Sequence, residues 1–292
     1  SPRPTMPSLV LTLSLLIPIV AIGLNYYVFS GVAAPPTDFG GGQMFDLIAT
    51  RYDLVNRVLA LRMDLGWRQV MVDHIKASTS KVSQPQLLDI STGTADVALL
   101  LSKSIPNAQI LGMDPSNNML NIGRTKVTQA GRSELIHLEY GAVSDFPGKL
   151  EPQKYDAATM SFGIRNVPDR EKALCDIHRV LKPNNSMFCI LEFSEPDESA
   201  GVLGYFAKLF IRHVVPIVGG ILSGKPREYL HLQNSIKDFP TPKNFVKLME
   251  GLSCGENGTG RFKVDELKQM NFGSVQLYVT RAIADPVVET QA

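Results

Sequence analysis

The sequence is poor in cysteine and tryptophan and carries almost no net charge. Its 292 residues include three cysteines and one tryptophan, and the formal net charge at pH 7 is +1. Such a charge gives no reason to expect a nucleic-acid partner. Because Cys175, Cys189 and Cys254 are odd in number and lack the spacing of metal ligands, we expect neither a disulfide framework nor a metal site. The length and the 44% hydrophobic content suffice for one α/β domain and an additional segment.

Charged side chains are absent from residues 9–29, which are strongly apolar. As a helix this stretch is about 30 Å long, roughly the hydrocarbon thickness of a bilayer. We therefore expect residues 1–30 to form a retained, single-pass transmembrane anchor that contacts the lipid bilayer through residues 9–29. Two alternatives stay open. One is a removable targeting segment, for which Arg3 and the small residues 32–34 provide features, and the other is a buried core helix.

Apolar periodicity is also missing from residues 31–42, which are rich in proline and glycine. This composition is typical of a flexible linker, so we place the folded domain at residues 43–292. Within that domain, residues 43–80 and 200–240 carry apolar residues at helical spacing. We expect these two stretches to form helical lid segments.

The chain lacks the G-x-G-x-x-G loop that binds the pyrophosphate of a dinucleotide. In its place, an apolar run at 87–90 leads into a loop of small residues around Gly93, and a helical pattern resumes at Val97. Small residues let a ligand approach the backbone closely, and the loop delivers that ligand to a helix N-terminus. A second apolar run, 110–113, ends in Asp114, at the spacing from Gly93 at which an acidic side chain binds a ribose. A nucleoside-bearing cofactor is predicted; the alternative is a plain strand-to-helix turn with an incidental acid.

Strand and helix patterns continue to alternate beyond Asp114. The apolar runs at 135–139, 155–160 and 186–193 predict strands, and residues 170–181 predict a helix. This alternation indicates a parallel sheet with helices on both faces. Ligands of such sheets bind at the carboxyl ends of the strands.

One of these strand ends carries Arg165 and Asn166 side by side after Gly163. The glycine permits a sharp turn, and the pair places a fixed cation and an amide where the reactive end of the cofactor is expected. The alternative is that Arg165 pairs with a nearby carboxylate and that Asn166 caps the next helix.

Several motifs occur in a fixed order between about residues 45 and 240. They include Leu88-Asp89-x-x-x-Gly93-Thr94-x-Asp96, Phe162-Gly163-Ile164-Arg165-Asn166-Val167-x-Asp169 and Leu191-Glu192-Phe193-Ser194. In this order and spacing, the chain resembles the ubiquinone/menaquinone biosynthesis C-methyltransferases of the UbiE type, a class I S-adenosylmethionine-dependent family. The further matching motifs are Phe45-x-x-Ile48-Ala49-x-x-Tyr52-Asp53-x-x-Asn56, Asp114-Pro115-x-x-x-Met119-Leu120-x-x-Gly123-Arg124, Arg179-Val180-Leu181-Lys182-Pro183 and Ser235-Ile236-x-x-Phe239-Pro240.

The resemblance implies an α/β, Rossmann-like class I methyltransferase fold, with a mostly parallel, doubly wound sheet preceded by the one transmembrane helix. It also implies S-adenosylmethionine as the cofactor and Arg165 and Asn166 as catalytic residues. Tyr52, Asn56 and Tyr229 are the expected substrate contacts. The expected cofactor-binding residues are Asp89, Ser91, Thr92, Gly93, Thr94, Asp114, Met119, Gly141, Ala142 and Ser161.

By the same resemblance, the substrate is a membrane-embedded, polyprenylated benzoquinol or naphthoquinol that is methylated on a ring carbon. A phenolic hydroxyl loses its proton, so that negative charge reaches this carbon. Arg165 is expected to stabilise the phenolate or to orient a proton-accepting water, and Asn166 to act as an orienting hydrogen-bonding group. Because such quinols partition into the bilayer, an anchor raises the concentration of the domain at the surface that holds the substrate. We expect an organellar membrane, either the mitochondrial inner membrane or the plastid thylakoid.

The chain departs from the family pattern at several positions. Ala95 replaces the last glycine of the loop, and residues 228–236 read Glu-Tyr-Leu-His-Leu-Gln-Asn-Ser-Ile where Ser-Tyr-x-Tyr-Leu-x-Glu-Ser-Ile is usual. We expect helical segments on both sides of the glycine-rich residues 253–260, and no recognisable final strand after Thr280. These departures leave a second function open, that of a structural subunit of an organellar membrane complex. A nicotinamide-dependent dehydrogenase is disfavoured, because the loop holds only Gly93.

Overall fold

The part of the chain that the computed structural model describes comprises residues 23, 29, 42–183, 186–197 and 200–284. The predicted transmembrane segment and the predicted linker lie outside it, apart from isolated positions. Both therefore stay predictions.

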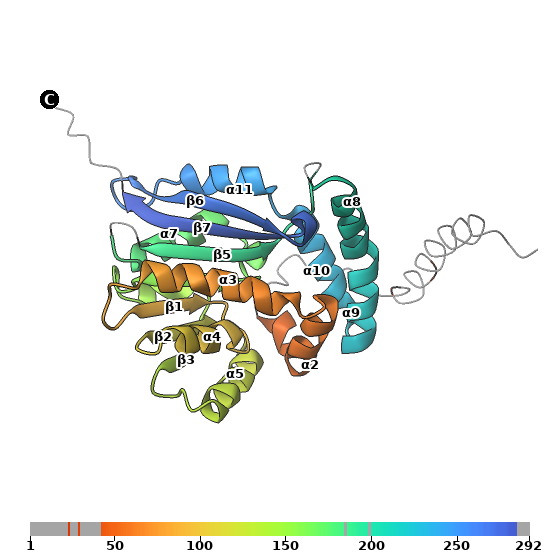
Figure 1. Ribbon diagram of the computed structural model, residues 1–292, viewed down its shortest axis with the longest axis horizontal. Coiled ribbons are helices and arrows are strands. Elements are labelled where there is room, and N and C mark those ends of the chain that lie inside the picture. The colour runs from red at the N-terminus through yellow and green to blue at the C-terminus, as the bar shows by residue number, and fades with distance from the viewer. Residues whose placement is uncertain (1–22, 24–28, 30–41, 184–185, 198–199, 285–292) are drawn as a thin grey trace, which may run out of the picture.

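Within the described residues, the centre of the domain is a seven-stranded sheet in the order β3-β2-β1-β4-β5-β7-β6 (Figure 1). Strands β1 to β5 are parallel, whereas β7 runs antiparallel to both β5 and β6. The strand order reverses between β1 and β4, which is where open α/β sheets bind ligands. The strands are β1 (Gln86–Ile90), β2 (Gln109–Asp114), β3 (Ile136–Tyr140), β4 (Ala157–Ser161), β5 (Met187–Phe193), β6 (Gly260–Met270) and β7 (Val275–Ala284).

Side chains of the parallel strands β1, β2, β4 and β5 alternate between two buried faces, whereas the edge strand β3 is mostly exposed. In β5, Phe188 and Ile190 pack on one face, and Cys189 and Leu191 pack on the other. Helices cover both faces, which is why these strands are continuous apolar runs in the sequence. The predicted parallel sheet is thereby confirmed. Helices α3 (Met63–Ser78), α4 (Asp96–Ser104) and α5 (Asn117–Gln129) cover one face, and α6 (Phe146–Lys149), α7 (Arg170–Val180) and α11 (Pro242–Glu250) cover the other.

The remaining helices gather beside the carboxyl ends of the parallel strands (Figure 1), and we call them the helical cap. Helix α9 packs against both α2 and α10. The Arg51 guanidinium of α2 also donates a hydrogen bond to the Leu222 carbonyl of α9 (3.0 Å). Both stretches expected as lid segments contribute to this cap. Its members are α2 (Gln43–Leu59), α8 (Gly201–Leu209), the π-helical turn η4 (Phe210–Val214), α9 (Val215–Ser223) and α10 (Pro226–Asp238).

One stretch of the cap, Gly201–Ser223, forms a continuous helix through α8, η4 and α9. Its length and its mean hydropathy of 1.5 suffice for a membrane span by composition alone. In the folded domain, 39% of its apolar window is buried. The α9 half packs into the cap, whereas several large apolar side chains of α8 are exposed.

In the C-terminal region, the sequence predicts a second helical segment and no final strand. The structure has two strands there instead. Strands β6 and β7 form a hairpin that turns at Asn271 and Phe272, both of which have positive φ angles (48° and 56°). Residues 275–280 are buried on both sides. In β6, a register shift between Val264 and Glu266 interrupts the alternation of polar and apolar side chains that identifies a strand. The prediction was wrong for this reason.

The expectation of no disulfide was also wrong. Cys175 of α7 is bonded to Cys254, which precedes β6, and the two Cα atoms lie 5.1 Å apart. The two cysteines are 79 residues apart in the sequence, so their proximity depends on the packing of α7 beside β6. The remaining cysteine, Cys189, is a buried thiol in the core.

Candidate functional site

Two adjoining cavities lie at the carboxyl ends of the parallel strands. The strand-end cavity has a volume of about 500 Å³ and is lined by the loops that follow β1, β2, β3 and β4. The cap cavity has a volume of about 560 Å³ and lies between these loops and the helical cap. Four residues line both cavities and form their common boundary: Phe45, Tyr52, Phe162 and Asn166.

The loop after β1 has an unusual backbone conformation. Ser91, Gly93 and Ala95 all have positive φ angles (54°, 54° and 66°). Such angles are costly for residues with a side chain and tend to occur at functional sites. A Cβ atom at Gly93 would meet nothing within 4 Å, so this backbone is open to a ligand. Helix α4 then begins after Ala95 without a side-chain cap.

Asp114, at the end of β2, lines the strand-end cavity. Its carboxylate accepts hydrogen bonds from the backbone N–H groups of Gly93 (2.8 Å) and Ser116 (2.8 Å). Burial raises the pKa of this carboxyl to about 6, although both hydrogen bonds oppose the shift. Asp114 therefore links the β1 loop to the β2 loop and presents a carboxylate to a ligand.

Of the other nine expected cofactor contacts, six also line this cavity. The remaining three, Asp89, Thr92 and Thr94, do not. Asp89 is buried and accepts hydrogen bonds from the hydroxyls of Thr92 (2.6 Å) and Thr159 (2.7 Å). Burial raises the pKa of Asp89 to about 6. The Thr94 hydroxyl donates to Asp53 of α2 (2.7 Å). These side chains stabilise the loop on the side that faces away from the cavity. The six that line the cavity are Ser91, Gly93, Met119, Gly141, Ala142 and Ser161.

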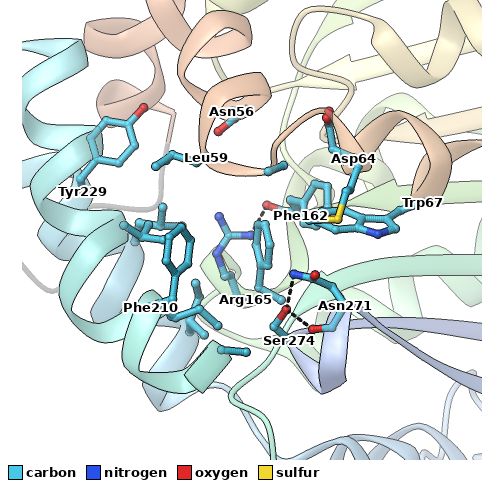
Figure 2. Close-up of a pocket in the computed structure, with 18 of the residues that line it drawn as sticks. Asn56, Leu59, Asp64, Trp67, Phe162, Arg165, Phe210, Tyr229, Asn271 and Ser274 are labelled. Atoms are coloured by element: carbon cyan, nitrogen blue, oxygen red, sulfur yellow. Dashed lines mark hydrogen bonds between the residues drawn. The ribbon is translucent and has the colours of Figure 1, made fainter. Parts of the chain in front are cut away.

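Arg165 lies in the short helix η2 (Ile164–Asn166) and lines the cap cavity. Its Nη1 atom donates to Glu192 Oε1 (2.7 Å) and to the Phe162 carbonyl (2.6 Å). The alternative of a carboxylate partner is thus confirmed, yet Figure 2 shows the guanidinium between Phe210 and Phe162, facing the cavity. The buried ion pair with Glu192 fixes where this positive charge lies.

Asn166 lies at the boundary of the two cavities. Its Oδ1 atom is 3.3 Å from Nε2 of His231, and its buried Nδ2 atom has no partner in the described part of the chain. The alternative that Asn166 caps the next helix is wrong, because Asp169 caps α7 by accepting a hydrogen bond from the Lys172 N–H (3.0 Å). Burial, followed by the charge of Arg165, lowers the pKa of His231.

The three expected substrate contacts all line the cap cavity. Tyr52 also lines the strand-end cavity, and burial raises the pKa of its hydroxyl. Asn56 lies one turn further along α2. Tyr229 of α10 is buried against α2, and burial raises the pKa of its hydroxyl as well. Figure 2 shows Asn56 and Tyr229 on the side of the cavity opposite Ser274.

Sequence reasoning missed Glu228 and His231, which line the cap cavity from α10. The signal was present, because both positions depart from the usual family pattern and lie three residues apart on one helix. It also missed Trp67 of α3, which packs edge-on against Phe193 in the cavity wall (6.4 Å between ring centroids).

A network of ion pairs holds α2 over both cavities. Lys126 of α5 pairs with Asp53 of α2 (2.9 Å) and with Asp96 of α4. Arg57 of α2 pairs with Asp96 and with Asp64 of α3. Because α2 also carries Phe45 and Tyr52, this network positions the common boundary of the cavities.

Replacing Lys126 by methionine leaves Asp53 and Asp96 without this cation. We expect the free energy of unfolding to fall by about 1–2 kcal/mol, since both carboxylates are only partly exposed. Urea denaturation measures the change. The matched control is Lys103→Met, at an exposed lysine of α4, which should change the free energy by less than about 0.5 kcal/mol. Equal effects of the two substitutions would contradict the role of the network.

The comparisons with known proteins agree on one family. The model of the ubiE/COQ5 methyltransferase family matches residues 39–260. A demethylmenaquinone methyltransferase of Thermus thermophilus is 38% identical over 70% of this chain and 89% of its own length. A ubiquinone/menaquinone biosynthesis C-methyltransferase UbiE of Geotalea daltonii is 36% identical over 72% of this chain and 86% of its own length.

A solved structure shows the same fold at much lower sequence similarity. It is a putative S-adenosyl-L-methionine-dependent methyltransferase from Methanococcus maripaludis, which matches with a TM-score of 0.55 and 15% identity. The match covers 82% of this chain and 94% of that one. The expected Rossmann-like methyltransferase fold is confirmed.

The strand-end cavity fits the cofactor of this family. It offers an acceptor carboxylate at Asp114 and an open backbone at Gly93. The carboxylate suits the hydroxyls of a ribose, and the open backbone lets a ligand approach closely. The chain therefore belongs to the ubiE/COQ5 methyltransferase family and is an enzyme that uses S-adenosylmethionine as its methyl donor.

Proposed function

We propose that this enzyme methylates a ring carbon of a polyprenylated benzoquinol or naphthoquinol. The observation that carries the proposal is the common boundary of the two cavities. A cofactor in the strand-end cavity and a ring in the cap cavity meet at Tyr52, Phe162 and Asn166. The quinone-biosynthesis names of the relatives support the ring chemistry.

S-adenosylmethionine supplies an electrophilic methyl group when bound. In the proposal, Asp114 accepts hydrogen bonds from the ribose hydroxyls, and Met119 and Ala142 contact the adenine. The backbone around Gly93 holds the methionine part, and Ser161 lies near the sulfonium. All of these residues line the strand-end cavity.

The cap cavity suits an aromatic ring with an apolar tail. Its wall includes Trp67, Phe162, Phe193, Phe206 and Phe210. Such a wall excludes water and stabilises the ring by apolar contact. A longer tail leaves past α8, where Phe206 is 60% exposed.

Proton transfer in this cavity falls to His231. A quinol hydroxyl gives its proton to the imidazole, directly or through one water, and Asn166 holds the imidazole in place. Arg165 stabilises the phenolate oxygen, because its guanidinium is fixed by Glu192 and faces the cavity. In the overall change, the ring carbon exchanges its hydrogen for the methyl group, and one proton is released to solvent.

The cap is proposed to face a membrane surface. Its outer side exposes large apolar side chains, among them Val202 and Tyr205 with exposed fractions of 73% and 62%, and Leu61, in the turn after α2, is 73% exposed. Phe272, 56% exposed, adds to this surface beside the cap cavity. An apolar surface around the mouth of a cavity for a lipid-soluble substrate supports the proposed membrane contact. The organellar location proposed from the sequence rests on the anchor.

Replacing Asp114 by asparagine is expected to weaken S-adenosylmethionine binding by about tenfold or more, because one charged acceptor is lost. Titration calorimetry of the full chain measures this. The affinity of the parent enzyme should fall as the pH is lowered through about 6, where Asp114 becomes protonated. The Asp114→Asn variant should not show the fall in affinity that protonation of Asp114 causes. Asp73→Asn, on the exposed side of α3, is the control. Unchanged affinity in the Asp114 variant would exclude this carboxylate from the cofactor site.

Replacing His231 by glutamine should lower kcat by about 100-fold, because the amide accepts no proton at neutral pH. In the parent enzyme, the pKa of His231 lies below its usual value, so the imidazole is neutral at pH 7. The rate should decline only as the pH falls through that lowered pKa. The His231 variant should show no such decline of the rate at low pH. The control His213→Gln, at an exposed histidine, should keep the decline. The same decline in the His231 variant would show that another group accepts the proton.

Replacing Val202 and Tyr205 together by glutamate places two charges on the exposed side of α8, outside both cavities. We expect methylation of a long-chain quinol in vesicles to fall at least tenfold. Methylation of a short-chain, water-soluble quinol should be unchanged. The control is Tyr140→Glu at an exposed tyrosine of β3. The membrane surface is wrongly placed if both variants lose the same activity in vesicles.

A further inference from the structure

Glu228 is a buried carboxylate that faces the cap cavity without a partner. It is the third residue of α10, is only 6% exposed and lines the cavity. In the described part of the chain, no hydrogen bond or ion pair to its side chain occurs. Because the side chain lines the cavity, a ligand there that donates a hydrogen bond can reach the carboxylate.

The charged groups around Glu228 are engaged elsewhere. Arg165 is paired with Glu192, and Asp64, across the cavity, is paired with Arg57 and Arg68. His231 follows Glu228 by three residues and contacts Asn166. Glu228 lies in the first turn of α10, at the positive end of the helix dipole. An ionised carboxylate accepts hydrogen bonds and donates none.

This restriction distinguishes the two redox states of a quinone ring. The reduced quinol carries hydroxyl groups that donate hydrogen bonds, whereas the oxidised quinone carries carbonyl oxygens that only accept them. A quinone oxygen beside Glu228 would place two acceptors together and leave the buried carboxylate unpaired. A site built around a buried acceptor rejects a ligand that lacks the donor.

We propose that Glu228 selects the reduced quinol over the oxidised quinone by accepting a hydrogen bond from one ring hydroxyl. This inference rests on the proposed function and adds a selectivity to it. Only the reduced ring can supply a phenolate, so rejection of the quinone keeps an unreactive ring from occupying the cavity. At this position the usual family pattern has a serine, whose hydroxyl both donates and accepts.

Binding of the two redox states can be measured separately from methyl transfer. Trp67 lines the cap cavity and is the single tryptophan of the chain, so its fluorescence reports occupancy. The full chain is titrated without oxygen with 1,4-naphthoquinol and, separately, with 1,4-naphthoquinone. Free tryptophan corrects for absorption by the ligands. We expect the parent enzyme to bind the quinol at least tenfold more tightly.

The variant Glu228→Gln keeps the shape of the side chain, but its amide can also donate to a carbonyl. We expect its preference for the quinol to fall below about threefold, mainly through tighter binding of the quinone. Glu134→Gln, at an exposed position before β3, should keep the full preference. Equal binding of both ligands by the parent enzyme would overturn the inference, even if the variant fails to fold. That result would leave the proposed function standing. A Glu228 variant with the full preference would also overturn it. If the parent enzyme binds neither ligand, the proposed function fails and this inference with it.

Discussion

The site depends on the close approach of the loops that follow β1 and β4. A Cβ atom at Gly163 would lie 2.6 Å from the Ser91 hydroxyl oxygen, so only glycine allows the two loops to touch. At this contact Phe162 has a positive φ angle of 57°, which directs the chain away from the strand. Phe162 and Asn166 are thereby placed between the two cavities. Without this approach, a methyl donor and its acceptor would not share a boundary.

A second layer of interactions holds the parts that meet at this boundary. Asp89 and Thr92 support the β1 loop from the core, and Asp114 ties it to the β2 loop. The ion pairs of Lys126 and Arg57 hold α2 against the same region from outside. The family motifs thus contain two kinds of residue, those that line a cavity and those that fix the loops in position.

The elements that depend on local pattern were predictable from the sequence. The five parallel strands and α7 are apolar runs or helical periods, and Asp114 follows from its spacing to Gly93. The β6–β7 hairpin was missed because a register shift between Val264 and Glu266 interrupts the alternation of β6. The bond between Cys175 and Cys254 was missed because it joins elements that are distant in the sequence. Glu228 and His231 became candidates only once the packing of α10 placed them in the cavity.

In the proposed reaction, a methyl group passes from the strand-end cavity to a ring carbon in the cap cavity. The most direct measurement uses the full chain in lipid vesicles with S-adenosylmethionine labelled with ¹³C in the methyl group. Prenylated naphthoquinol and benzoquinol that lack the ring methyl group are supplied in reduced form. The account predicts a labelled methyl group on a ring carbon of at least one product, detected by mass spectrometry and NMR. Cofactor binding without transfer to either ring, or transfer to a ring oxygen, would contradict it.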